Sequence, residues 1–74
     1  MKGSEVRHIR EKLELSREEF ATIFGLSGYQ SVMNIETDFR RTSKLTMILL
    51  RTLDALPMSK AKALIELLRK HANA

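Results

Sequence analysis

The residues of this 74-residue chain with the most specific chemistry are two amides, Gln30 and Asn34, which lie four positions apart. In a helix that spacing places both side chains on one face, opposite the apolar Val32 and Ile35. The amides of Gln and Asn bond in a bidentate manner to the N6 and N7 atoms of adenine, and each good pair supplies roughly 1–3 kcal/mol of discrimination between bases. We therefore expect a helix whose exposed polar face contacts base edges in the major groove.

Polar and basic residues on both sides of these amides are of types that contact nucleic acid. Tyr29 and Ser31 lie at the start of the same helix, where base edges are usually reached. The backbone amides at 27–29 and the Ser27 hydroxyl are suited to bind a phosphate at the helix N-terminus. Arginine and lysine before and after this helix are expected to contact phosphates and to give binding a steep salt dependence. The predicted base-contacting residues are Tyr29, Gln30, Ser31 and Asn34, and the predicted backbone-contacting residues are Arg17, Ser27, Gly28, Arg40, Arg41 and Lys44.

Five helices, and no strand, are predicted to position these side chains. Polar and apolar residues nowhere alternate for long enough to indicate a strand, whereas apolar residues recur at helical spacing in five segments. The predicted helices cover residues 5–13, 16–24, 29–37, 44–56 and 60–71. The predicted fold class is therefore all-α, with residues 16–37 forming two short helices joined by a tight turn.

Residues typical of helix ends mark these boundaries. Ser16 and Glu19 form a predicted capping box at the start of the second helix, with Leu15 placed to pack on Phe20. Gly25 is expected to end that helix in a left-handed conformation. The other predicted end signals are Ser4, Ser43 and Ser59 as N-caps, Asp38 as the left-handed end of the third helix, and Pro57 as the stop of the fourth.

The apolar stripes of these helices predict one core and one further surface. The predicted core residues are Val6, Ile9, Leu13, Phe20, Ala21, Phe24, Leu26, Val32, Ile35, Leu45, Ile48, Leu49, Leu53 and Leu56. The helix at 60–71 lies beyond the helices that residues 16–37 need for support. We predict that its residues Leu64, Ile65 and Leu68 form a twofold dimer contact; the alternative is that this helix only covers the bundle.

The length and composition indicate a single small globular domain over residues 1–74. Hydrophobic residues make up 43% of the chain and charged residues 30%, and there is no cysteine. The N-terminal residues lack the apolar run of a signal peptide, and no stretch approaches the ~20 apolar residues of a membrane span, so we expect a soluble cytoplasmic protein. Residues 1–39 hold five basic and seven acidic residues, and residues 40–74 hold eight basic and two acidic ones. The net charge of +4 therefore does not locate the candidate site.

No set of residues indicates an enzyme or a metal site. His8 and His71 are far apart in the sequence, and neither has a cluster of further ligands beside it. The carboxylates from Glu11 to Glu19 are assigned to exposed helix faces and to a cap, and Glu36 to a local structural hydrogen bond rather than a base contact. Neither a nucleophile with a neighbouring base nor a glycine-rich phosphate loop occurs. We therefore expect no enzyme activity and no cofactor.

A longer pattern extends over most of residues 5–56. It comprises Leu15-Ser16, Glu19-Phe20-Ala21, Phe24-Gly25-Leu26-Ser27, Val32, Ile35-Glu36 and Arg40. In these positions the chain resembles the Cro/CI-type helix-turn-helix family, which includes phage repressors, XRE-like bacterial regulators and small antitoxins. Gly28 lengthens the turn by one residue relative to the usual spacing of that family. The resemblance implies a compact five-helix lambda-repressor-like bundle, base contacts from Tyr29, Gln30, Ser31 and Asn34, and backbone contacts from Arg17, Ser27, Arg40 and Ser43.

Together these features predict a DNA-binding transcriptional regulator. We expect a homodimeric repressor that occupies an inverted-repeat operator in its own or a neighbouring promoter, because a chain this short can do little beyond occupying DNA. The alternative is an antitoxin or another interaction protein whose main task is to bind a protein partner. The resemblance also extends to small autoregulators encoded beside anti-CRISPR genes in phages.

Overall fold

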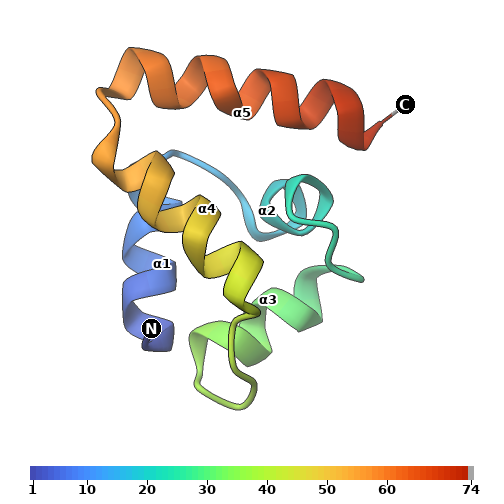
Figure 1. Ribbon diagram of the computed structural model, residues 1–74. Coiled ribbons are helices and arrows are strands. Elements are labelled where there is room, and N and C mark those ends of the chain that lie inside the picture. Colours follow the sequence, from blue (N-terminus) through green and yellow to red (C-terminus); the bar gives the residue numbers. More distant parts are fainter. Residues whose placement is uncertain (74) are drawn as a thin grey trace.

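The computed structural model describes residues 1–73, over which the chain forms five helices and no strand (Figure 1). The helices are α1 (Gly3–Lys12), α2 (Arg17–Ile23), α3 (Tyr29–Glu36), α4 (Lys44–Ala55) and α5 (Met58–Ala72). The all-helical prediction is confirmed, and most boundaries lie within one residue of the predicted ones, although α1 and α5 each begin two residues earlier. No helix in the described part of the chain is both long enough and apolar enough to cross a membrane.

The helix α3 lies at one end of the molecule and α5 at the other (Figure 1). α3 contacts both α1 and α2, α5 contacts α2 and α4, and α4 also contacts α1. A single core forms between them, and its largest fully buried side chains are Phe20, Leu50, Leu53, Val6 and Val32. Because helices as short as α3, with eight residues, are held mainly by tertiary packing, these contacts fix its position.

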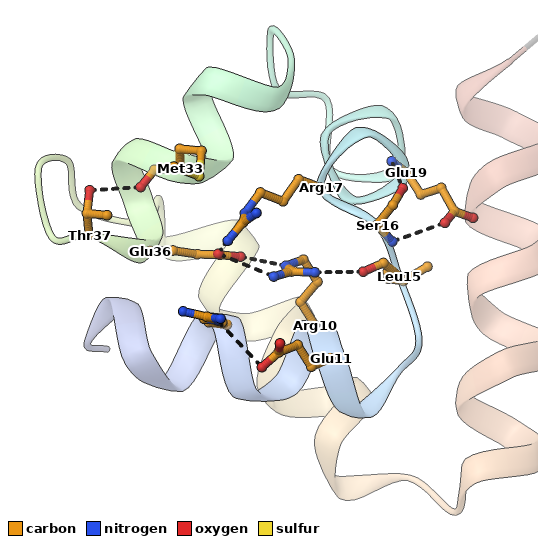
Figure 2. A network of polar contacts seen from close by, with 10 residues as sticks. Arg10, Glu11, Leu15, Ser16, Arg17, Glu19, Met33, Glu36 and Thr37 are labelled. Atoms are coloured by element: carbon orange, nitrogen blue, oxygen red, sulfur yellow. Dashed lines mark hydrogen bonds and ion pairs between the residues drawn. The ribbon is translucent and has the colours of Figure 1, made fainter.

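The predicted end signals of α2 are present. The Glu19 backbone N–H donates to Ser16 Oγ at 3.1 Å and the Ser16 N–H donates to Glu19 Oε1 at 3.0 Å, which completes the capping box (Figure 2). The bond from the Ser16 N–H is the main cause that lowers the pKa of the Glu19 carboxyl. At the other end Gly25 has a φ of 68°, and the Leu26 N–H donates to the Ala21 carbonyl at 2.8 Å. This is a Schellman C-cap, which favours glycine as its left-handed residue.

The predicted buried face of α4 is correct only in part: Leu53 is buried and Leu56 packs partly against the core, as predicted. Leu45 and Ile48, predicted as core residues, are 67% and 48% exposed, whereas Thr46 and Leu50 are buried. Apolar residues occur on nearly every side of α4, so helical spacing alone does not select one face. The packing of α4 against α1 and α5 selects it. The buried Thr46 hydroxyl is satisfied because it accepts from Ser43 Oγ at 3.0 Å.

The helix α5 covers the bundle with its predicted apolar stripe. Ile65 is 3% exposed, and Leu64 and Leu68 are partly buried against the same core. These are the three residues of the predicted dimer contact, which stays a prediction; the structure shows that Ile65 is covered by its own chain and that Leu64 and Leu68 are partly covered. Ser59 is not the N-cap, since Pro57 takes that position and the helix begins directly after it.

Candidate nucleic-acid interface

The helix α3 is anchored by two apolar residues and begins after a glycine. Val32 is fully buried and Ile35 is 6% exposed, so the opposite side of the helix faces solvent. Gly28 precedes the helix with a φ of 158° and a ψ of −167°, a conformation nearly restricted to glycine. Apart from Gly28 and its two chain neighbours, no heavy atom of residues 1–73 lies within 4 Å of an added Cβ, so the requirement for glycine is conformational rather than steric. Gly28 thereby sets the direction of the backbone where α3 begins.

Of the four predicted base-contacting residues, Gln30, Ser31 and Asn34 lie along one side of α3, and Tyr29 is its first residue. Tyr29 is 44% exposed and Gln30 is also exposed. Ser31 and Asn34 are half-buried. Gln30 Nε2 donates to Asn34 Oδ1 at 3.1 Å, so the two amides expected to share a face are in direct contact. The hydroxyl of Ser31 is hydrogen-bonded to that of Ser27, which ties the turn to the first turn of the helix.

Glu36, the last residue of α3, is bound by two arginines (Figure 2). Arg10 of α1 donates from Nε to Glu36 Oε2 at 2.6 Å, and Arg17 of α2 donates from Nε to Glu36 Oε1 at 3.1 Å. The side chain of Glu36 is 3% exposed and that of Arg10 is 9% exposed. Arg10 also donates from Nη1 to the Leu15 carbonyl at 2.9 Å. We refer to Arg10, Arg17 and Glu36 as the Glu36 network, which joins α3 to both α1 and α2.

The structural role predicted for Glu36 is confirmed, but its partners are not local. Arg10 and Arg17 lie 26 and 19 residues away in the sequence. Arg17, predicted to contact phosphate, also lies over the Tyr29 ring with its guanidinium 5.6 Å from the ring centroid. The hydrogen bond to Glu36 raises the pKa of Arg17 above its ordinary value. In this structure Arg17 therefore positions α3 and Tyr29.

The predicted backbone-contacting residues after α3 lie on the surface. Arg40 and Arg41 belong to the α3–α4 loop, and Ser43 and Lys44 stand at the start of α4; all four are exposed. The loop folds back on α3 because the Arg40 N–H donates to the Asn34 carbonyl at 3.0 Å. Within residues 1–73 none of the three cations is in an ion pair. The loop and the first residue of α4 thus present three positive charges beside the end of α3.

Asp38 and Gly3 join the start of α1 to the end of α3. Asp38 has a φ of 63°, as predicted for a left-handed helix end. Its Oδ1 accepts from the Gly3 N–H at 2.8 Å, which explains why α1 begins before the predicted Ser4 cap. Gly3 is buried, and a Cβ added to it would lie 2.4 Å from the Glu36 carbonyl oxygen. This close approach requires glycine, and it fixes α1 against the last turn of α3.

The exposed side of α3 carries no carboxylate. Glu36 is the only acidic residue in the sequence of this helix, and its side chain is turned inward between two arginines. The adjoining loop contributes Arg40 and Arg41. An uncharged polar surface bordered by cations suits a polyanion that also offers hydrogen-bonding groups. No known protein family, curated protein or solved structure matches this chain.

Proposed function

We propose that this chain is a sequence-specific DNA-binding transcriptional regulator in which α2, the turn at residues 24–28 and α3 form a helix-turn-helix. The observation that carries the proposal is the pair Gln30 and Asn34, hydrogen-bonded to each other on a side of α3 without a carboxylate. In the proposed complex α3 lies in the major groove, about 12 Å wide, and its exposed side contacts base edges. α2 then lies across the DNA backbone.

Gln30 is the principal base-contacting residue in this proposal. One N–H of its Nε2 donates to Asn34 Oδ1, and the second N–H remains free to donate, next to the acceptor Oε1 of the same amide. A donor and an acceptor on one amide match N7 and N6 of adenine. Asn34 holds the Gln30 amide in one orientation, so less side-chain freedom is lost on binding. Asn34 thus supports the contact and still has its own Nδ2 to donate.

Phosphate contacts on both sides of α3 complete the proposed complex. Arg40, Arg41 and Lys44 bind phosphates beside the end of α3, and the Ser27 hydroxyl with the backbone amide of Gly28 binds one beside its start. Side chains in a recognition site act best when the supporting residues hold them within about 0.5 Å of the required geometry. The Glu36 network supplies that support, because it links α3 to α1 and α2 through a buried carboxylate.

Two copies on an inverted repeat would block a promoter, and we place their contact on α4. Leu45 and Ile48 are 67% and 48% exposed, and residues three positions apart share a face of a helix. A twofold contact buries the same face of both copies. Half-sites one turn of DNA apart require the two α3 helices to lie about 34 Å apart. The chain then represses transcription by occupying the DNA.

DNA binding tests the proposal directly. Duplexes selected from a randomised pool and the DNA upstream of the chain's own gene are titrated by fluorescence anisotropy, beside an unrelated duplex of equal length. We expect specific, salt-sensitive binding by the wild type. Gln30→Ala should lose roughly 1–3 kcal/mol of discrimination at one base pair, and Arg40→Ala should weaken binding to all duplexes, with a salt slope smaller by about 0.9. Wild-type binding that fails to distinguish the duplexes contradicts the proposal.

A second candidate function is binding of a different protein, as in an antitoxin. The exposed Leu45 and Ile48 favour it, because the same α4 face suits a foreign partner as well as a second copy. Isolation of the chain in a 1:1 complex that covers this face, with no operator binding by the isolated chain, would support this candidate. Tight operator binding by the chain alone would support the repressor.

A further inference from the structure

A basic pocket lies between the start of α1, the α3–α4 loop and α4. Its volume is about 440 Å³, and its lining includes four cationic side chains: Lys2, Arg40, Arg41 and Arg51. The two arginines of the loop are already expected to contact phosphate. Lys2 and Arg51 come from distant parts of the sequence, and the fold brings them to the same pocket. The basic surface therefore extends from the loop onto α1 and α4.

The positive charge of this pocket is only partly compensated within residues 1–73. None of its four cations is in an ion pair among residues 1–73. The lining also includes two carboxylates, Asp38 and Glu5, and both are engaged at the start of α1. Asp38 Oδ1 accepts from the Gly3 N–H at 2.8 Å, and Glu5 Oε1 accepts from the Lys2 N–H at 3.5 Å. Among the side chains of the lining, four cations and two carboxylates leave a surplus of two positive charges.

The types of these cations favour a phosphate group over other anions. Three of the four are arginines, whose planar guanidinium donates two parallel N–H groups to the oxygens of a phosphate. All four side chains are exposed, so an anion can reach them without a rearrangement of the core. The pocket thus combines open access with donors of the appropriate geometry.

The pocket is fixed to the end of α3. The N-terminus and the α3–α4 loop lie at the same end of the molecule (Figure 1), and Gly3 contacts the last turn of α3 too closely to admit a Cβ. The Arg40 N–H is bonded to the Asn34 carbonyl at 3.0 Å, so the loop wall is tied to the same helix. An anion in the pocket is therefore held at a set position relative to Gln30. Phosphates of a DNA strand line the wall of a groove that contains a helix.

We propose that this pocket binds a phosphate group, which in the complex with DNA is a backbone phosphate beside the last turn of α3. The assignment of this phosphate to DNA rests on the proposed function. The proposal that the pocket binds a phosphate group does not depend on that function. Lys2 and Arg51 then act as phosphate-binding residues in addition to those of the loop. They add affinity without adding sequence preference.

The first part of the test measures DNA binding by Lys2→Gln, Arg51→Gln and the double variant. Lys60→Gln is the matched control, because it removes the same charge from an exposed position on α5 that does not line the pocket. Each pocket variant should weaken binding several-fold on selected and unrelated duplexes alike, and should reduce the salt slope by about 0.9. Lys60→Gln should change neither, and Arg51→Lys should keep the salt slope but bind less tightly than the wild type, because lysine has no parallel pair of N–H groups. Thermal melts confirm that the variants are folded.

The second part titrates inorganic phosphate into the chain without DNA and follows backbone amide shifts. Phosphate should shift the amide signals of residues 38–42, and Arg51→Gln should abolish these shifts. If the pocket variants nevertheless bind DNA as tightly as the wild type, the phosphate that the pocket binds belongs to a free phosphate compound and not to DNA. The proposal is overturned if phosphate causes no such shifts and the pocket variants bind DNA with the same affinity and salt slope as Lys60→Gln. The proposed function fails by a different result, namely wild-type binding to DNA without sequence preference. In that case the phosphate titration alone tests whether the pocket binds phosphate.

Discussion

Glu36→Ala is expected to destabilise this chain strongly. In the structure the partners of the Arg10 guanidinium are Glu36 and the Leu15 carbonyl, and the Arg10 side chain is 9% exposed. Without the carboxylate, the charge of Arg10 stays buried beside one neutral acceptor. Removal of one partner from a buried ion pair costs roughly 3–5 kcal/mol. Arg17, whose side chain is 25% exposed, can turn toward water and adds less to the loss.

That loss is large for a domain of this size. Stabilities of roughly 0.05–0.15 kcal/mol per residue give about 4–11 kcal/mol for a chain of 74 residues. In domains of 60–100 residues, 1 kcal/mol corresponds to a shift of about 4–8 °C in the melting temperature. A loss of 3–5 kcal/mol should therefore lower the melting temperature by roughly 12–40 °C.

Urea and thermal unfolding followed by circular dichroism measure this effect. Glu18→Ala, which makes the same change at an exposed position in the first turn of α2, is the matched control and should lose less than about 1 kcal/mol. The double variant Arg10→Met/Glu36→Leu should lose much less than the sum of its single changes, because it leaves no buried charge unpaired. If Glu36→Ala is no less stable than Glu18→Ala, the Glu36 network does not hold α3 and the reasoning fails.

Gly3→Ala is expected to lower the melting temperature despite the better helix propensity of alanine, because its Cβ would meet a backbone carbonyl at 2.4 Å. Calorimetry beside Ser4→Ala measures this, and an unchanged melting temperature contradicts the close contact. Glu19→Gln is expected to lose stability at neutral pH. Folding lowers the pKa of Glu19, mainly through the Ser16 N–H, so its contribution is present above the ordinary value of 4.5 and is lost as the pH falls through the folded-state value. Urea unfolding of variant and wild type should therefore differ at neutral pH and converge in acid; a constant difference argues against the capping bond as its source. Leu45→Ser is expected to convert a dimer to a folded monomer, because this side chain is 67% exposed. Light scattering at micromolar concentration checks it, and a wild type that is already monomeric rules out the α4 contact.

The ends of α2 were predictable from the sequence, whereas the start of α1 was not. Ser16, Glu19 and Gly25 lie within or next to the helix that they bound, so local spacing alone indicates their roles. α1 instead begins at Gly3 because Asp38, from the loop after α3, accepts its N–H. A bond between segments so far apart in the chain leaves no local pattern.

Burial was predicted correctly where a helix has one apolar stripe and only in part where it has several. In α3 the spacing of Val32 and Ile35 leaves one choice, and both residues are buried. In α4 apolar residues follow one another around the helix, and contacts with α1 and α5 bury Leu50 rather than Leu45 or Ile48. The buried face of α4 is therefore determined by the helices that pack against it and not by its own sequence pattern.

In the candidate site, too, contacts within one helix were predictable and contacts between helices were not. Gln30 and Asn34 lie on one helix, so their spacing predicts the shared face on which the structure shows them hydrogen-bonded. Arg10 and Arg17 meet at Glu36 only because α1 and α2 pack on α3, and nothing in the sequence around Arg10 distinguishes it from an exposed arginine. Lys2 and Arg51 were missed for the same reason, since the fold alone places them in one pocket.

Contact between α3 and DNA is measured most directly by backbone amide shifts of the labelled chain during titration with its selected duplex. We predict the largest shifts in residues 27–34 and 40–44, nearly none in α5, and a clearly different pattern with an unrelated duplex of the same length. Largest shifts on α4 and α5, with residues 27–34 unchanged, would contradict the central proposal that the exposed side of α3 contacts the bases.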